Sequence, residues 1–179
     1  MKRLIIASFL VLISISGFSQ EKKLTQKKKT TFGITAGLNS NFHTLNGYRN
    51  QEPTNLYGGL FVERSLKGKF RLQAEILYSR IQSENFNMFE LPISLKYEIT
   101  DRFRVLTGVQ VNYLYNRRNL NFFDRKIENP INFGAHLGVE YDLSEKWFLS
   151  LRYTHRFTKN VHPDINNIKG FRLGIGFRF

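Results

Sequence analysis

The sequence predicts an all-β fold, namely an eight-stranded antiparallel up-and-down transmembrane β-barrel. Three observations lead to this prediction. Apolar and polar residues alternate through most of the chain, the connections between the alternating segments are long and short in turn, and aromatic residues bracket the apolar face. A period of two is the pattern of a β-strand whose two faces meet different surroundings.

The alternation is clearest in the last segment, "KGFRLGIGFRF", where Phe, Leu and Ile occupy one face and Arg and Gly the other. Seven earlier segments repeat the pattern less strictly. The eight segments are 31–39, 56–62, 70–78, 90–98, 103–115, 131–143, 147–156 and 169–179. Each is long enough to cross a bilayer as a tilted strand or nearly so, and the even number permits closure into an up-and-down barrel.

The connections sort by length. "SLKGK", "TDR" and "SEK" are tight turns, whereas residues 42–54, 83–87, 116–129 and 158–169 form longer connections. In an antiparallel meander, successive connections lie at opposite ends, so all the longer ones share one end. Outer-membrane barrels have this arrangement, with short periplasmic turns and longer outside loops.

Aromatic residues band the apolar face at both ends, with Ile, Leu, Val and Ala between them. The expected girdle near the tight turns contains Phe70, Tyr97, Phe103, Tyr141, Trp147 and Phe179, and the opposite band contains Phe42, Tyr78, Phe89, Tyr113, Phe133, Tyr153 and Phe171. Tyr and Trp favour the membrane boundary, because the ring is apolar and its polar atom can reach water. The apolar face is therefore predicted to face lipid.

The polar face carries both signs of charge in nearly equal number. We expect a lumen charge network made of Glu63, Arg71, Glu75, Lys96, Glu98, Arg104, Glu140, Arg152, Arg156, Arg172 and Arg178, joined by Glu90 and Asp142. A narrow lumen requires this balance, because a buried unpaired charge is costly. Glycines on the same face are expected to make room for long Arg side chains. An eight-stranded interior is filled by side chains, so no general diffusion pore is predicted.

The start of the chain predicts export. Lys2 and Arg3 precede a short apolar run, and small residues follow it, as in a secretory signal peptide. We expect a signal peptide at 1–19, a basic periplasmic leader at 20–30 and the barrel domain at 31–179. There is no cysteine, so disulfides contribute nothing to an exported chain of this size.

Several stretches resemble a known family. "FRLQAEILYSR", "FELPISLKYEI", the Gly-rich strand around Gly108 and the ending "LGIGFRF" are similar to the PorT-like outer-membrane β-barrel proteins of Bacteroidetes-type bacteria. The resemblance covers the chain from about Thr31 onward. It implies an eight-stranded outer-membrane barrel and a C-terminal strand that the barrel-insertion machinery recognises. It implies little about activity, although the family's namesake serves a protein-secretion apparatus.

No catalytic, cofactor-binding or metal-binding residues are predicted. The four histidines show no ligand spacing, and there is no phosphate-binding loop or nucleophile elbow. His136 is expected to be a hydrogen-bonded lumen residue. His155 points outward near the rim, so a lipid-modifying Ser–His pair on the lipid face stays open as an alternative.

The net charge of +13 suits acidic partners. For an exported barrel these are phosphorylated lipid headgroups rather than nucleic acid. Arg117, Arg118 and Lys126 in the outside loops are candidate contacts to lipopolysaccharide. The predicted role is structural or of the adhesion type, exercised through four outside loops. Two alternatives are a barrel that assists secretion or assembly of other proteins, and an exported soluble lipocalin-like binding barrel whose apolar face points inward.

Overall fold

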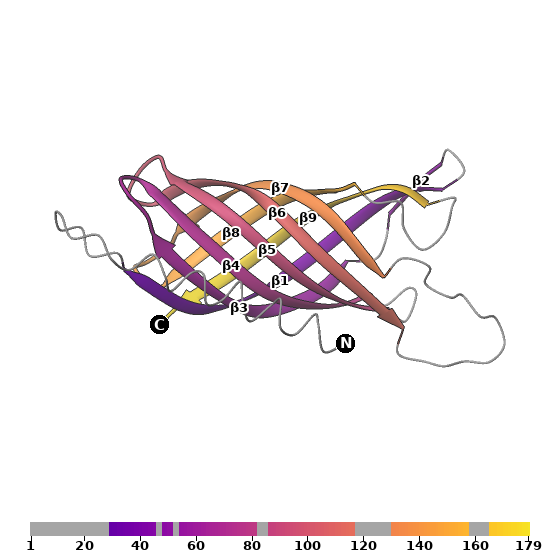
Figure 1. Ribbon diagram of the computed structural model, residues 1–179, viewed down its shortest axis with the longest axis horizontal. Coiled ribbons are helices and arrows are strands. Elements are labelled where there is room, and N and C mark those ends of the chain that lie inside the picture. The colour runs from indigo at the N-terminus through magenta and orange to yellow at the C-terminus, as the bar shows by residue number, and fades with distance from the viewer. Residues whose placement is uncertain (1–28, 46–47, 52–53, 82–85, 117–129, 158–164) are drawn as a thin grey trace, which may run out of the picture.

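The computed structural model describes residues 29–45, 48–51, 54–81, 86–116, 130–157 and 165–179. These residues form nine strands and no helix. The strands are β1 (Thr30–Leu45), β2 (Tyr48–Gln51), β3 (Asn55–Ser65), β4 (Phe70–Ile81), β5 (Phe86–Glu98), β6 (Phe103–Asn116), β7 (Ile131–Asp142), β8 (Trp147–Arg156) and β9 (Ile165–Arg178). Every neighbouring pair is antiparallel, and β1 also pairs with β9, so the sheet closes on itself (Figure 1).

Eight of these strands, β1 and β3 to β9, form the wall of a barrel, which confirms the predicted fold. The ninth strand corrects the prediction for residues 42–54, which are not all loop. β1 continues to Leu45, and β2 pairs with its end from Phe42↔Gln51 to Leu45↔Tyr48. This hairpin lies beyond the wall, where neither face must be apolar. Its sequence therefore lacks the alternation from which the other strands were predicted.

The three tight turns lie at one end of the barrel together with the C-terminus (Figure 1). Each has four residues between its strands, at 66–69, 99–102 and 143–146. The hydroxyls of Thr100 and Ser144 accept hydrogen bonds from the backbone N–H of Phe103 (3.0 Å) and Trp147 (3.1 Å). In the remaining turn Gly68 has a φ of 69°, which glycine adopts without a steric penalty. The longer connections begin and end at the opposite end of the barrel, and apart from β2 their central residues lie outside the described ranges.

Closure depends on the pairing of the first and last strands. The register runs from Gly33↔Arg178 to Leu45↔Ile165 with one irregularity after Phe42, and the backbone N–H of Phe179 donates to the carbonyl of Phe32 (2.9 Å). A closed sheet has no unpaired edge, and this is the condition for placing strands in hydrocarbon. No helix in the described part of the chain is long and apolar enough to cross a bilayer.

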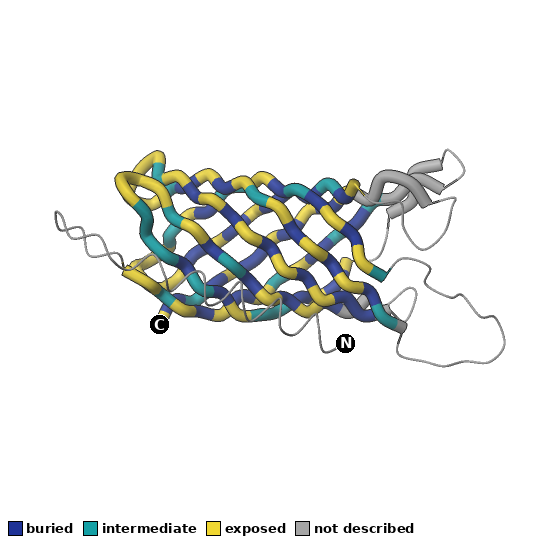
Figure 2. The backbone as a smooth tube through the Cα atoms, in the orientation of Figure 1, coloured by how far each residue is buried: buried dark blue, intermediate teal, exposed yellow. Residues whose placement is uncertain are grey.

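Burial alternates along each strand of the wall (Figure 2). Outward residues such as Phe32, Leu60 and Leu137 are about 60% exposed, whereas inward Glu90 and Lys96 are fully buried. The apolar face is thus the outside of the cylinder. A water-soluble barrel would need the reverse arrangement, since large exposed apolar surfaces mark contact with lipid or a partner.

Trp147 tests this orientation directly, because it is the only tryptophan in the chain and its side chain is 45% exposed on the outward face. We expect brominated lipid to quench its fluorescence in vesicles. The matched control is the double variant Trp147→Phe/Phe148→Trp, which moves the indole to a position that points inward and is 1% exposed. Equal quenching of the two proteins would contradict the orientation of the wall.

Candidate functional site

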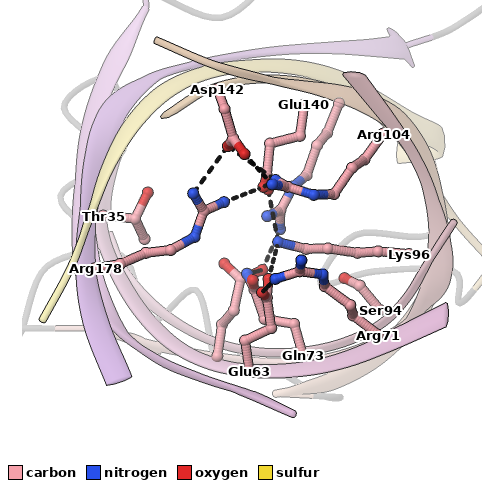
Figure 3. Close-up of polar contacts among 12 residues, drawn as sticks. Thr35, Glu63, Arg71, Gln73, Ser94, Lys96, Arg104, Glu140, Asp142 and Arg178 are labelled. Carbon is pink, nitrogen blue, oxygen red and sulfur yellow. Dashed lines mark hydrogen bonds and ion pairs between the residues drawn. The ribbon is translucent and has the colours of Figure 1, made fainter. Parts of the chain in front are cut away.

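The charged residues predicted for the lumen occupy inward positions. The buried ones are Glu63, Glu75, Lys96, Arg104, Glu140, Arg152, Arg156, Arg172 and Arg178. Arg71 and Glu98 are partly exposed near the tight turns, with 28% and 27% side-chain exposure. Seen along the barrel, side chains from several strands converge on the axis (Figure 3).

Lys96 lies at the centre of the contacts near the tight turns. Its ammonium group donates to Glu63 Oε2 at 2.7 Å and to Glu140 Oε2 at 2.6 Å, so one residue of β5 joins β3 and β7 across the lumen (Figure 3). The other oxygen of Glu140 accepts from Arg104 at 2.5 Å and Arg178 at 2.6 Å. One carboxylate thus neutralises part of the charge of three cations.

The same network extends to the mouth of the barrel. Asp142 accepts hydrogen bonds from Arg178 (2.8 Å) and from both terminal nitrogens of Arg104. Arg71 contacts Glu63 at 3.0 Å and also pairs with Glu98. We define the basal network as Glu63, Arg71, Lys96, Glu98, Arg104, Glu140, Asp142 and Arg178. It contains four cations and four anions, so its formal charge is balanced.

Two further ion pairs lie nearer the loop end. Arg152 Nη1 contacts Glu75 at 2.5 Å, and Gln73 donates to the same carboxylate oxygen at 2.7 Å. Arg172 Nη2 lies 2.6 Å from both oxygens of Glu90. These charge-assisted contacts hold β9 to β5 and β8 to β4 across the interior.

Beyond Glu90 the described polar lining consists mainly of neutral side chains, together with the buried Arg156 at the end of β8. Gln110 donates to Asn112 (2.9 Å), and Asn112 donates to Asn132 (2.8 Å). All three are buried. The polar lining therefore changes from ion pairs to side-chain amides along the axis.

Sequence reasoning missed the apolar side chains that fill the rest of the lumen. The buried members are Tyr57, Phe61, Leu77, Met88, Leu106, Leu114 and Phe148. The guanidinium of Arg178 lies 4.3 Å from the centre of the Phe148 ring, and that of Arg172 lies 4.7 Å from the Tyr57 ring. Phe61 and Phe148 meet edge to face at 5.6 Å. The aromatic rings thus pack against the cations and fill space beside them.

Glycines of the neighbouring strand make room for these large groups. In the register of the sheet, Gly176 is opposite Phe148 and Gly33 is opposite Phe61. A Cβ added at Gly176 would lie 2.0 Å from the Phe148 ring. The predicted position of inward glycines opposite arginines is found at Gly138, which is opposite Arg152, and at Gly33, which lies between Arg178 and the Phe61 ring. Gly176 instead accommodates the Phe148 ring. An inward glycine opposite a large residue is the signal that could have located these rings.

His136 is buried, and its Nε2 lies 2.8 Å from the hydroxyl of Ser94. Within the described ranges, no three His, Asp or Glu side chains are grouped so that they could hold a metal ion. His155 faces outward, and its direct cross-strand neighbours are Ala135 and Lys169. Neither direct neighbour is a serine, so no Ser–His pair forms across these two pairings.

The remaining predicted residues divide into two groups. Most of the expected girdle is exposed on the outward face, namely Phe70, Tyr97, Tyr141, Trp147 and Phe179, whereas Phe103 is half-buried. Ring contacts join Phe70 to Tyr97 at 5.0 Å. The candidate lipopolysaccharide contacts Arg117, Arg118 and Lys126 lie outside the described residues, as do the predicted signal peptide and most of the leader.

Residues 9–179 match the model of a protein family described as "Outer membrane protein beta-barrel domain". The chain belongs to this family. A barrel of this family resides in the outer membrane, in agreement with the closed wall and its outward apolar face. No curated protein sequence matches the chain.

Solved structures share the fold of this outer-membrane barrel at low sequence identity. Neisserial surface protein A (NspA) is 14% identical with a TM-score of 0.55, and the alignment covers 84% of this chain and 98% of that one. Ail, the attachment invasion locus protein of Yersinia pestis, is 13% identical with a TM-score of 0.56, covering 84% and 99%. A designed transmembrane β-barrel is 13% identical with a TM-score of 0.50, covering 87% and 100%.

The fit between glycine and ring predicts an unequal response to two alanine substitutions. Gly176→Ala should destabilise the barrel by about 1–3 kcal/mol, because the new Cβ overlaps the Phe148 ring. Gly58→Ala is the control, since no heavy atom lies nearer than 3.8 Å to a Cβ placed there. Denaturant unfolding in lipid vesicles, followed by gel mobility, measures both. Equal midpoints for the two variants would contradict the proposed packing.

The basal network predicts a large effect at Lys96. Lys96→Met should cost about 3–5 kcal/mol, because Glu63 and Glu140 then stay buried without their shared cation. Lys146→Met, at an exposed turn, should cost far less. Adding Glu63→Gln to Lys96→Met should restore part of the loss. The same unfolding measurement applies, and an unchanged midpoint for Lys96→Met would exclude a structural role for the network.

Proposed function

We propose that this protein is a non-enzymatic structural barrel of the outer membrane whose lumen is closed to general diffusion, and that it acts through its four loops in an adhesion-type role. The observation that carries the proposal is the basal network. Lys96 meets Glu63 and Glu140 near the axis, and Phe148 lies 5.3 Å from the Lys96 ammonium. Charged and aromatic groups from opposite walls therefore occupy the space that a solute would need.

We propose further that the tight turns and both ends of the barrel domain face the periplasm, and that the longer loops are extracellular. The separation of short and long connections at opposite ends supports this orientation. The similarity to NspA and Ail concerns the fold, and it is compatible with a surface role because Ail is an attachment invasion protein by name.

The other functions are less well supported. A soluble lipocalin-like binder would need an apolar interior, whereas the described lumen contains the ion pairs and the outside is apolar. A role in secretion or assembly rests on the finer resemblance to PorT-like barrels. Proteins that co-purify with the barrel after mild crosslinking would distinguish that role from a purely structural one.

Planar-bilayer recording tests the closed lumen. We expect no large, steady conductance from the folded protein, because the buried ion pairs and rings fill the interior. A general porin inserted under the same conditions is the positive control, and the heat-modifiable gel mobility of the sample establishes that the barrel is folded. Reproducible open-channel steps from the folded protein would overturn the proposal.

A further inference from the structure

The outward surface carries a groove of about 550 Å³ with an almost wholly apolar lining. Ten of its twelve lining residues belong to two adjacent rows that follow the register of the sheet, and the pair Leu106 and Gly138 lies between these rows. One row is Phe70, Tyr97, Val105, Val139 and Leu151, and the other is Leu95, Thr107, Leu137, Tyr153 and Phe171. The groove is therefore a channel between two ladders of side chains that crosses the strands from β4 to β9.

The path of the groove suits an extended hydrocarbon chain. Five steps between six strands, at about 4.8 Å each, give a length of roughly 24 Å. Strands in such barrels tilt by about 40°, so a row perpendicular to them rises by roughly 15 Å along the membrane normal. That is about half the thickness of the hydrocarbon core, or one leaflet.

Aromatic pairs lie at both ends of the groove, and aliphatic residues and one threonine lie between them. Phe70 and Tyr97 meet at 5.0 Å at the lower end, and Tyr153 and Phe171 meet at 5.2 Å at the upper end. The hydroxyl of Thr107 donates to the backbone carbonyl of His136 at 3.1 Å. This hydroxyl group, which lies in the middle of the groove, therefore needs no hydrogen-bond acceptor from a bound ligand.

A basic site adjoins the upper end. Lys169 and His155 are direct cross-strand partners, each two residues beyond the aromatic pair of Phe171 and Tyr153 towards the loops. Among the described outward side chains of the strands, Lys169 and Arg64 are the only Lys or Arg residues, and no Asp or Glu is present. Arg64 lies at the opposite end, near a tight turn. Lys169 is exposed, so an anion at this rim meets a cation and no carboxylate from the described outward face of the strands.

We propose that this surface binds one molecule of lipid A, the membrane anchor of lipopolysaccharide. One acyl chain lies in the groove between the two rows, and a phosphate contacts the ammonium of Lys169 and the imidazole of His155. The choice of lipid A over a phospholipid rests on the proposed orientation, which places this rim in the outer leaflet. The apolar groove and the basic pair are separate observations, and both suit a molecule with a phosphate above a hydrocarbon chain.

Native mass spectrometry of the folded barrel in detergent, titrated with purified lipid A, tests the site. Lys169→Ser should weaken binding by about fivefold, and Arg64→Ser, which removes the outward cation at the other end, should not. Val139→Phe should block the groove and also weaken binding, whereas Val62→Phe places the same ring on the outward face of β3, away from the groove. Val105→Phe is a second groove variant, for use if Val139→Phe fails to give the mobility of a folded barrel.

Binding of three lipids distinguishes the contribution of the phosphate from that of the rest of the lipid A molecule. Dephosphorylated lipid A should bind the wild-type protein as weakly as intact lipid A binds Lys169→Ser, and phosphatidylglycerol should bind more weakly than lipid A. Equal binding of intact and dephosphorylated lipid A, equal binding of phosphatidylglycerol, or equal effects of Val139→Phe and Val62→Phe would overturn the proposal. Such a failure leaves the closed lumen untouched, because conductance is measured separately.

Discussion

The outward face of the wall is surrounded by lipid, so most described charges of the strands lie inside the eight-stranded cylinder, and the outward exceptions, Arg64 and Lys169, lie at its two rims. This constraint makes the basal network the central feature of the structure. Lys96 contributes a point charge that two carboxylates share, and Glu140 in turn accepts from two arginines. A buried ion pair offsets its desolvation only with good geometry and additional hydrogen bonds, and a chain of alternating signs supplies both. The proposed closure of the lumen rests on this arrangement.

The second requirement of the barrel interior is that large and small inward side chains lie opposite each other, and the strand register sets which residues meet. Large inward groups lie opposite glycines of the next strand, as Phe148 does at Gly176 and Tyr57 does at Gly37. A slip by one residue would turn these rings toward lipid and their apolar neighbours into the lumen. A slip by two residues in one direction would place Phe148 opposite Arg178 instead of Gly176. Ion pairing and ring packing therefore specify the same alignment, including the pairing of β1 with β9 that closes the wall.

The sequence predicts the strands and their faces well, because a period of two assigns each residue to one side of the sheet. It does not predict which charges meet. Lys96 and Glu140 are 44 positions apart, and their contact depends on the stagger of three strands around the cylinder. The buried rings were missed because they interrupt the alternation: Phe61 stands between Leu60 and Val62, and Phe148 between Trp147 and Leu149, so three apolar residues follow one another. β2 was missed because its hairpin has no lipid-facing side. The outward groove depends on two rows assembled from six strands, so no single segment of the sequence contains it.

The kind of polar side chain that lines the lumen also changes along the barrel axis, so the two ends have different properties. The basal network occupies the end with the tight turns, the pairs of Glu75 and Glu90 with their arginines lie further along, and buried amides such as Asn112 and Asn132 lie near the loops. A neutral amide loses much less than an ion when it leaves water, and it accepts a water molecule as readily as another amide. The balanced charges of the basal network lie at the end with the tight turns, so the proposed closure of the lumen depends mainly on that end of the barrel.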